Sequence, residues 1–298
     1  MPAFPDRRRV LTGLAAFPLL PKLAIAQTGG ERSLNQRVVL SGHSLTDSVE
    51  WPLKAMVQAA GGPAADAEVI DRSTTPGSTM KYRWQPDSPM DIDARRGMSK
   101  YATLVLTERV PIRSAIMWEE TEKYALKWFE HAWKTGNGGR GAETVFYASW
   151  VGIGSGPGNT DPYDMPDEGQ IPFRERLDLE MTAWQGVADL VNARRPKGSP
   201  RMRVIPGPKI MAAIFDAIAA GTAPGITAMQ DLFEDNIHPN RKGAYPIALA
   251  HFAVIYGRDP RTMPLIRGEE GWPSAAQQDW MKSLVREVIS AYPDSGLT

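Results

Sequence analysis

A serine near the start of the chain stands where a catalytic nucleophile would be useful. Ser44 follows a short apolar run at residues 37–40 and precedes a segment, 53–60, whose apolar pattern predicts a helix. Gly42 permits a sharp turn after the first run. A serine N–H beside a helix N-terminus can stabilise the oxyanion that forms during acyl transfer. The alternative is that Ser44 or Thr46 only caps the following helix.

A general base at neutral pH is most often a histidine. His131 and His251 fall in expected helices, which indicates packed or surface side chains, whereas His238 lies in the polar, irregular segment 233–240. Asp235 stands three residues before His238. That spacing lets its carboxylate reach the imidazole Nδ1, fix the tautomer and leave Nε2 to take a proton from a serine. The alternative is an Asx-type turn with a surface histidine.

Together, the two segments resemble the SGNH (GDSL-like) hydrolase family. That family's first block, Gly-Asp-Ser-Leu-(Ser/Thr) after strand one, is matched by Gly-His-Ser-Leu-Thr at residues 42–46. Its last block, Asp-x-x-His-Pro-Asn, is matched by Asp-Asn-Ile-His-Pro-Asn at residues 235–240. The resemblance covers about residues 38–256 and implies a flavodoxin-like fold. It also implies a triad with the nucleophile Ser44, the base His238 and the orienting carboxylate Asp235.

The resemblance implies an oxyanion hole as well, in which the N–H of Ser44 is one donor. The family's second block contributes a glycine after strand two, which Gly77 matches, although a plain turn glycine remains the alternative. The third block should read Gly-x-Asn-Asp, but residues 107–110 read Thr-Glu-Arg-Val. Loss of one donor costs about 10²–10³ in rate, so we expect a substitute. Arg109 takes the place of the asparagine by register, and Thr107 or Arg109 is the candidate donor.

Two further residues depart from the family pattern. Glu108 would oppose a neighbouring oxyanion unless it is protonated or paired, for example with Arg109 or Arg113. His43 replaces the family's aspartate beside Ser44. Because adjacent strand residues point in opposite directions, the sequence argues against His43 as the base and leaves it a role in shaping the pocket.

Strand-like and helix-like segments alternate along the chain. We expect strands at 37–40, 67–70, 102–106, 144–148 and 202–205, and helices at 53–60, 115–133, 174–193, 208–219, 243–256 and 275–289. The stripe of the long helix 115–133 includes Met117, Tyr124 and Trp128. This alternation predicts a three-layer α/β/α domain around a parallel sheet of about five strands, with ligands beyond the carboxyl ends of the strands. Residues 152–169, rich in Gly, Pro and Asp, are expected to form either a lip over the site or a mobile surface loop.

Composition excludes several classes of function. Of 298 residues, 42% are hydrophobic and 23% charged, which is ordinary for a globular α/β protein. Lys+Arg and Asp+Glu both number 34, and no basic stripe is visible, so we expect no nucleic-acid partner. With no cysteine and four scattered histidines, no ligand cluster for a metal-dependent hydrolase is apparent, and neither metal nor cofactor is expected.

The first 27 residues resemble a twin-arginine export signal. Arg7 and Arg8 precede an apolar run at 10–20, and Ala-Ile-Ala at 24–26 offers a cleavage site. The run is too short and interrupted to span a bilayer. We therefore predict passage through a bacterial export machinery, a periplasmic or secreted location without stable membrane insertion, and one domain over 28–298. The alternative is an uncleaved anchor or disordered arm.

These observations predict a serine esterase. An exported enzyme of this family would remove small acyl groups, such as acetyl, from carbohydrate or cell-envelope substrates, and acyl transfer between polymers is a variant of the same chemistry. Trp84, Trp118 and Trp150 are candidates for stacking on sugar rings, although most tryptophans are core residues. The alternative, supported by the altered third block, is a catalytically silent binding or envelope-associated protein with the same fold.

Overall fold

The computed structural model describes residues 30–88, 90 and 92–297, so the export signal predicted at 1–27 lies outside it. Within the described residues, no helix is both long and apolar enough to cross a membrane.

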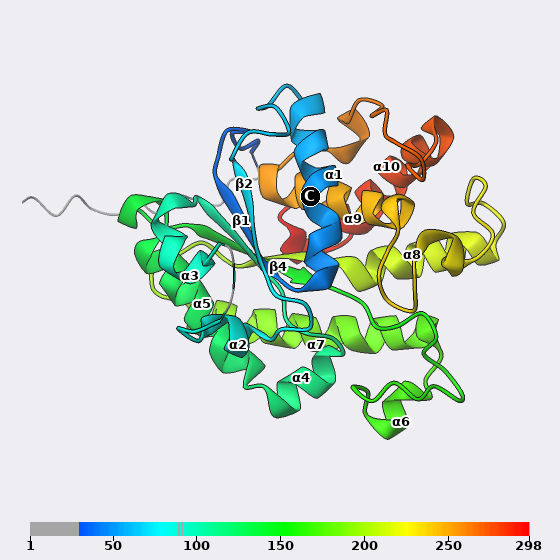
Figure 1. The fold of residues 1–298 in the computed structure, drawn as a ribbon, viewed down its shortest axis with the longest axis horizontal. Helices are drawn as coiled ribbons and strands as arrows, with labels where there is room; N and C mark the ends of the chain where they lie inside the picture. The colour runs from blue at the N-terminus through cyan, green and yellow to red at the C-terminus, as the bar shows by residue number, and fades with distance from the viewer. Residues whose placement is uncertain (1–29, 89, 91, 298) are drawn as a thin grey trace, which may run out of the picture.

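A parallel sheet of five strands forms the centre of the described chain (Figure 1). The strand order is β2-β1-β3-β4-β5, which is the flavodoxin-like order and confirms the predicted fold class. β1, β3 and β5 are buried along their whole length, as strands covered by helices on both faces must be. The strands are β1 (Val38–Gly42), β2 (Ile70–Thr74), β3 (Thr103–Leu106), β4 (Glu143–Ala148) and β5 (Arg203–Pro206).

Helices cover both faces of this sheet, giving three layers. In Figure 1, α1, α9 and α10 lie on one side of the strands, and α5 and α7 lie on the other. The helices are α1 (Ser44–Ala59), α2 (Met80–Trp84), α3 (Ala94–Gly97), α4 (Ile112–Trp118), α5 (Thr121–Thr135), α6 (Pro166–Gly169), α7 (Phe173–Arg194), α8 (Gly207–Ala219), α9 (Arg241–Tyr256) and α10 (Ala275–Ser290).

The long helix predicted at 115–133 is wrong, because the chain breaks it into α4 and α5. Glu120, between the two, has a left-handed backbone with φ of 53° that no helix interior can contain. The buried face of α5 includes Tyr124 and Trp128, as predicted. Met117 belongs to α4 instead, and its side chain is 54% exposed rather than part of that stripe.

Two boundaries near the candidate nucleophile also differ from the prediction. α1 begins at Ser44 rather than at residue 53, and Pro52 lies inside it. A proline removes one backbone hydrogen bond but does not end this helix. β2 runs over Ile70–Thr74 rather than 67–70, since it pairs with β1 up to Gly42↔Thr74. Ser44 therefore opens α1 at the carboxyl edge of the sheet, where β1 and β2 end side by side.

Candidate active site

Ser44 is the first residue of α1 and follows β1 after one intervening residue. The turn that permits this depends on Gly42. A Cβ at Gly42 would lie 1.9 Å from Thr46 Oγ1 and 2.9 Å from Thr107 Cγ2, so a larger residue would clash. Among the described residues, no protein group accepts a hydrogen bond from the N–H of Ser44. This N–H at the start of a helix is therefore available to a negatively charged oxygen.

The structure brings Ser44, His238 and Asp235 together in the predicted arrangement. The Ser44 Oγ lies 2.9 Å from His238 Nε2, and His238 Nδ1 lies 2.7 Å from Asp235 Oδ2. The other carboxylate oxygen of Asp235 accepts the N–H groups of Ile237 and His238, at 2.8 and 2.7 Å. The Asp235 carboxylate therefore does both things that the sequence left as alternatives: one oxygen closes an Asx-type turn, and the other contacts the His238 ring.

The charge on Asp235 determines how the imidazole can work. Partial burial opposes ionisation, but the N–H groups of His238 and Ile237, together with the His238 ring, lower the pKa of Asp235 to about 2. An ionised carboxylate can only accept, so Nδ1 of His238 carries the proton and Nε2 has a free lone pair. The Ser44 hydroxyl can donate to that lone pair, which is the geometry needed for proton transfer.

The loop that carries His238 is held from several sides. Phe233 pairs with Pro239 in an antiparallel bridge, and Asn240 caps α9 directly after it. The indole N–H of Trp150 donates to the carbonyl oxygen of Ile237 at 3.0 Å. Trp150 is fully buried, so it supports the loop from the core and cannot stack on a sugar, contrary to that sequence prediction.

No model of a protein family matches this chain, and no curated protein matches it. Among solved structures, a DUF4886 family protein from Bacteroides uniformis matches with a TM-score of 0.59 and 14% identity, over 87% of this chain and 96% of that one. A protein assigned as an SGNH hydrolase, from Slackia heliotrinireducens, matches with a TM-score of 0.45 and 14% identity, over 72% and 95%. A lipase from a goat rumen metagenome matches with a TM-score of 0.37 and 14% identity, over 75% and 99%. At such identities, a likeness shows the fold alone. The strand order, together with the likeness to the DUF4886 family protein, shows that the chain has a flavodoxin-like α/β/α fold.

His43 occupies a buried position beside Ser44, the candidate nucleophile. The N–H of Leu45 donates to His43 Nδ1 at 3.4 Å, so the proton is on Nε2, which donates to the Glu108 carbonyl oxygen at 2.9 Å. Burial, together with the nearby charge of Arg83, lowers the pKa of His43 to about 3. His43 is therefore a neutral cap of α1 that joins it to the end of β3, and both of its nitrogens are occupied.

Glu108 is paired with Arg109, as the sequence indicated, but through the backbone N–H of that residue and not through its guanidinium. The Glu108 side chain is fully buried and accepts the N–H groups of Met80 and Arg109, at 3.0 and 2.8 Å, and the hydroxyl of Thr121 at 3.1 Å. Burial raises the pKa of Glu108, while the charge of the buried Arg83 opposes that rise. The carboxylate thus anchors the loop after β3 through its backbone.

Arg83 is a buried residue near the site that sequence reasoning missed. Its guanidinium donates to the carbonyl oxygens of Ser78 and Thr107 and to the hydroxyls of Ser78 and Ser41. These bonds tie the loop after β2 to the ends of β1 and β3. No local signal marks Arg83, since an arginine in a short polar stretch is ordinarily exposed.

A cavity of about 680 Å³ lies over the Ser44 hydroxyl. Gly77 and Arg109 line it together with Ser44 and His238, which keeps both as candidate oxyanion donors. Thr107 does not fit that role, because its N–H donates to Ser41 and its buried hydroxyl donates to the Glu108 carbonyl oxygen. The backbone N–H of Arg109 is also taken, so its guanidinium is the group that can face the cavity.

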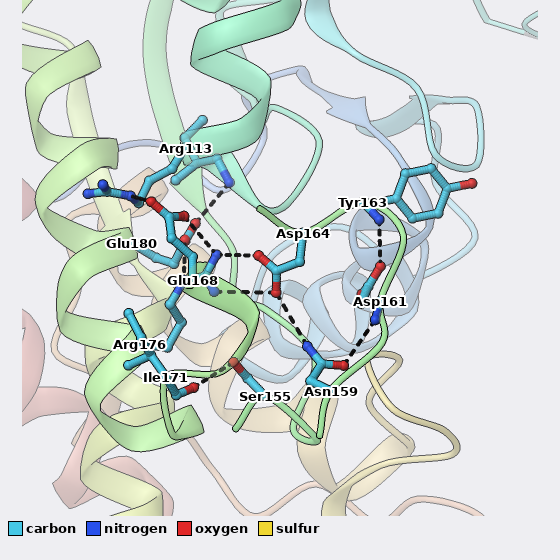
Figure 2. Close-up of polar contacts among 11 residues, drawn as sticks. Arg113, Ser155, Asn159, Asp161, Tyr163, Asp164, Glu168, Ile171, Arg176 and Glu180 are labelled. Atoms are coloured by element: carbon cyan, nitrogen blue, oxygen red, sulfur yellow. Dashed lines mark hydrogen bonds and ion pairs between the residues drawn. The ribbon is translucent and has the colours of Figure 1, made fainter. Parts of the chain in front are cut away.

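The segment 152–169 forms a lip of this cavity. Gly152 and residues 159–163 line it together with Gly77 and Arg109. Figure 2 shows how the lip is tied down: Asp164 and Glu168 converge on the guanidinium of Arg176, which is fully buried on α7.

The two remaining histidines are structural, as expected. His131 lies 2.7 Å from the Arg95 carbonyl oxygen, and the buried His251 lies 2.8 Å from that of Ile247. Burial lowers the pKa of His251 to about 4. In the part of the chain that the structure describes, no group of three or more His, Asp or Glu residues is placed to hold a metal ion.

Proposed function

We propose that this protein is a serine hydrolase of carboxylic esters. The observation that carries the proposal is the His238 ring, which lies 2.9 Å from the Ser44 hydroxyl and 2.7 Å from the Asp235 carboxylate. Such a chain turns a weak hydroxyl nucleophile into a reactive one, because the base is in contact and its tautomer is set.

The proposed reaction has two halves. Ser44 Oγ attacks the ester carbonyl while His238 Nε2 takes its proton, and Asp235 stabilises the imidazolium that forms. The developing oxyanion faces the N–H of Ser44, with Gly77 and the Arg109 guanidinium as the further proposed donors. The imidazolium then protonates the leaving alcohol. A water activated by His238 releases the acyl group, or another hydroxyl takes it in the acyl-transfer variant.

The proposed substrates are small acyl esters, such as acetyl groups on carbohydrate or cell-envelope polymers. The sequence resemblance and the export-like segment at 1–27 support this class, and a periplasmic or secreted location is proposed on the same segment. Val110, Pro111 and Val151 give the Ser44 cavity an apolar wall that suits an acyl group.

Hydrolysis of p-nitrophenyl esters, combined with labelling by a fluorophosphonate, tests the proposal. We expect Ser44-dependent release of p-nitrophenol from the acetate, faster than from the octanoate. Mass spectrometry of the labelled protein should find the phosphonyl group on Ser44. A protein that hydrolyses no short ester and takes no label would be a catalytically silent relative instead.

Replacing Asp235 by asparagine should lower kcat by about 10³–10⁴. The amide NH₂ would donate to Nδ1, so the proton of His238 would move to Nε2, which then cannot accept from Ser44. Steady-state kinetics with p-nitrophenyl acetate measure this. The matched control is Asp231→Asn, since Asp231 caps the turn at Thr227 and Ala228. Equal losses in the two variants would contradict a role of Asp235 in the reaction.

Protonation of Asp235 should not contribute to the pH dependence of the wild-type activity above pH 5. The pKa of Asp235 is lowered to about 2, from an ordinary value of 3.8. A carboxyl with a lowered pKa contributes fully above its ordinary value and is lost only as the pH falls towards the lowered one. Measured with p-nitrophenyl acetate, the wild-type kcat/KM should therefore show a single ionisation on the acid side of its pH profile from pH 5 upward, with no second loss from protonation of Asp235.

A further inference from the structure

A second cavity, of about 940 Å³, adjoins the one over Ser44. The two share part of their lining, so they form one continuous groove from the nucleophile outward. The shared residues are Pro76, Gly77, Arg109, Pro162 and Tyr163. We call the outer part, towards Tyr82 and Trp118, the outer groove. An acetyl group and its carbonyl would fill only a small part of this groove, since the second cavity alone is near the upper end of the range of pockets that hold drug-sized ligands.

Large apolar side chains are concentrated in the outer groove. Four of the seven that are exposed in the described part of the chain line it. Trp118 is 69% exposed, Tyr163 65%, Met117 54% and Tyr82 43%. Exposed aromatic rings gathered in a cavity beside a reactive serine indicate a binding surface rather than ordinary scatter. Trp84 and Trp150 differ from Trp118, because the former packs edge-on against Trp128 and the latter is fully buried.

Several contacts hold the lip side of the outer groove in place. Asp164, the residue after Tyr163, is bound by both terminal nitrogens of Arg176, at 2.6 and 3.3 Å (Figure 2). The N–H of Tyr163 donates to Asp161 at 2.9 Å. The guanidinium of Arg109 lies over the Tyr163 ring, 5.6 Å from its centroid. A ring that is fixed before binding loses little conformational entropy when a ligand stacks on it.

The rim of the outer groove is polar. Lys81, Gln85 and Glu119 line it beside the aromatic rings. A sugar ring has the matching character, with flat apolar C–H faces and hydroxyl groups around its edge. A fatty acyl chain would instead gain most from closed, aliphatic walls, and here the rings stand open to water.

We propose that the outer groove binds the carbohydrate part of the ester substrate, with sugar rings stacked on Tyr163 and on Trp118. This inference rests on the proposed function, because it places the alcohol side of the ester in the outer groove and the acyl group at Ser44. It requires a substrate of at least two sugar rings, since Trp118 lines the outer cavity and not the cavity over Ser44.

The test uses a panel of O-acetylated tetrasaccharides built of neutral hexoses, pentoses or uronic acids, with the matching acetylated monosaccharides. We expect wild type to prefer one tetrasaccharide over its monosaccharide. Trp118→Ala should lower kcat/KM for that tetrasaccharide about tenfold or more, and lower that for p-nitrophenyl acetate several times less. Trp51→Ala is the control, since Trp51 is 48% exposed outside the groove and packs on Trp272. It should change neither activity.

Three results would overturn the proposal. The first is that Trp118→Ala lowers kcat/KM equally for the tetrasaccharide and for p-nitrophenyl acetate. The second is that it lowers neither. The third is that wild type prefers no tetrasaccharide over its monosaccharide. A selective loss with p-nitrophenyl octanoate would place the acyl chain in the outer groove instead.

Binding separates this proposal from the proposed function. Calorimetry with deacylated tetrasaccharides and the Ser44→Ala protein needs no catalysis. Binding that is lost in Ser44→Ala/Trp118→Ala would support the groove even if no ester is hydrolysed. Ser44-dependent hydrolysis without any such binding would contradict the carbohydrate-binding role of the outer groove and leave the proposed function intact.

Discussion

Replacing Ser44 by alanine is expected to lower kcat for p-nitrophenyl acetate by about 10⁴–10⁶. The substitution removes the atom that would form the acyl-enzyme, so only water positioned by the remaining groups could attack the ester. His238 and Asp235 cannot compensate, since a triad acts as a unit and loses nearly all of its effect with its nucleophile. The residual rate over the uncatalysed reaction would come from the oxyanion donors and from substrate binding.

We expect the Ser44→Ala protein to fold normally, so that its loss of activity reports on the reaction and not on stability. The Ser44 side chain makes a hydrogen bond to His238 at the wall of an open cavity, so the melting temperature should change little. Ser48→Ala is the matched control, because Ser48 lies one turn later in α1 and its hydroxyl donates to the Leu45 carbonyl oxygen. It should keep its activity. Substantial hydrolysis by Ser44→Ala would rule out Ser44 as the nucleophile.

Replacing Arg176 by methionine is expected to lower the free energy of unfolding by about 3–5 kcal/mol. Arg176 is fully buried and pairs with three carboxylates, Asp164, Glu168 and Glu180, at 2.6, 3.2 and 2.9 Å. Figure 2 shows these groups converging from the lip and from α7. Methionine keeps much of the volume but leaves the carboxylates uncompensated. Glu180 would contribute most to the loss, since its side chain is also fully buried and its charge would have neither water nor a cation nearby.

Urea unfolding of Arg176→Met measures this loss against a control on the same helix. Arg174 pairs with Asp178 and Asp216, both at 2.8 Å, but those carboxylates are 47% and 55% exposed. Arg174→Met should therefore cost about 1 kcal/mol or less. If Arg176→Met cost no more than the control, the cluster would not be what holds the lip.

The fold and the position of the candidate nucleophile could be predicted because both depend on local sequence. Short apolar strands alternating with helices define the layers, and Gly42 permits the close turn that places Ser44 at the start of α1. Asp235 and His238 meet within one turn, so a spacing of three residues was enough to predict their contact.

Other predictions failed where the structure depends on more than the pattern of residues along the chain. The break between α4 and α5 follows from the backbone at Glu120, which periodicity does not reveal. Arg113, predicted as a partner of Glu108, pairs with Glu168 on the lip instead. Arg83 and Arg176 gave no sequence signal at all, because a buried charge is recognisable only by the partners that surround it.

The sequence by itself determined the layered sheet, the serine at the end of its first strand and the local pairing of Asp235 with His238. Only the tertiary structure decided which of three candidate tryptophans is open to a ligand. Trp84, Trp118 and Trp150 look alike along the chain, and burial by residues far away in sequence leaves Trp118 alone of the three strongly exposed, at 69%. The physical reason is that exposure is a property of the packed molecule, whereas a sequence motif reports only neighbours along the chain.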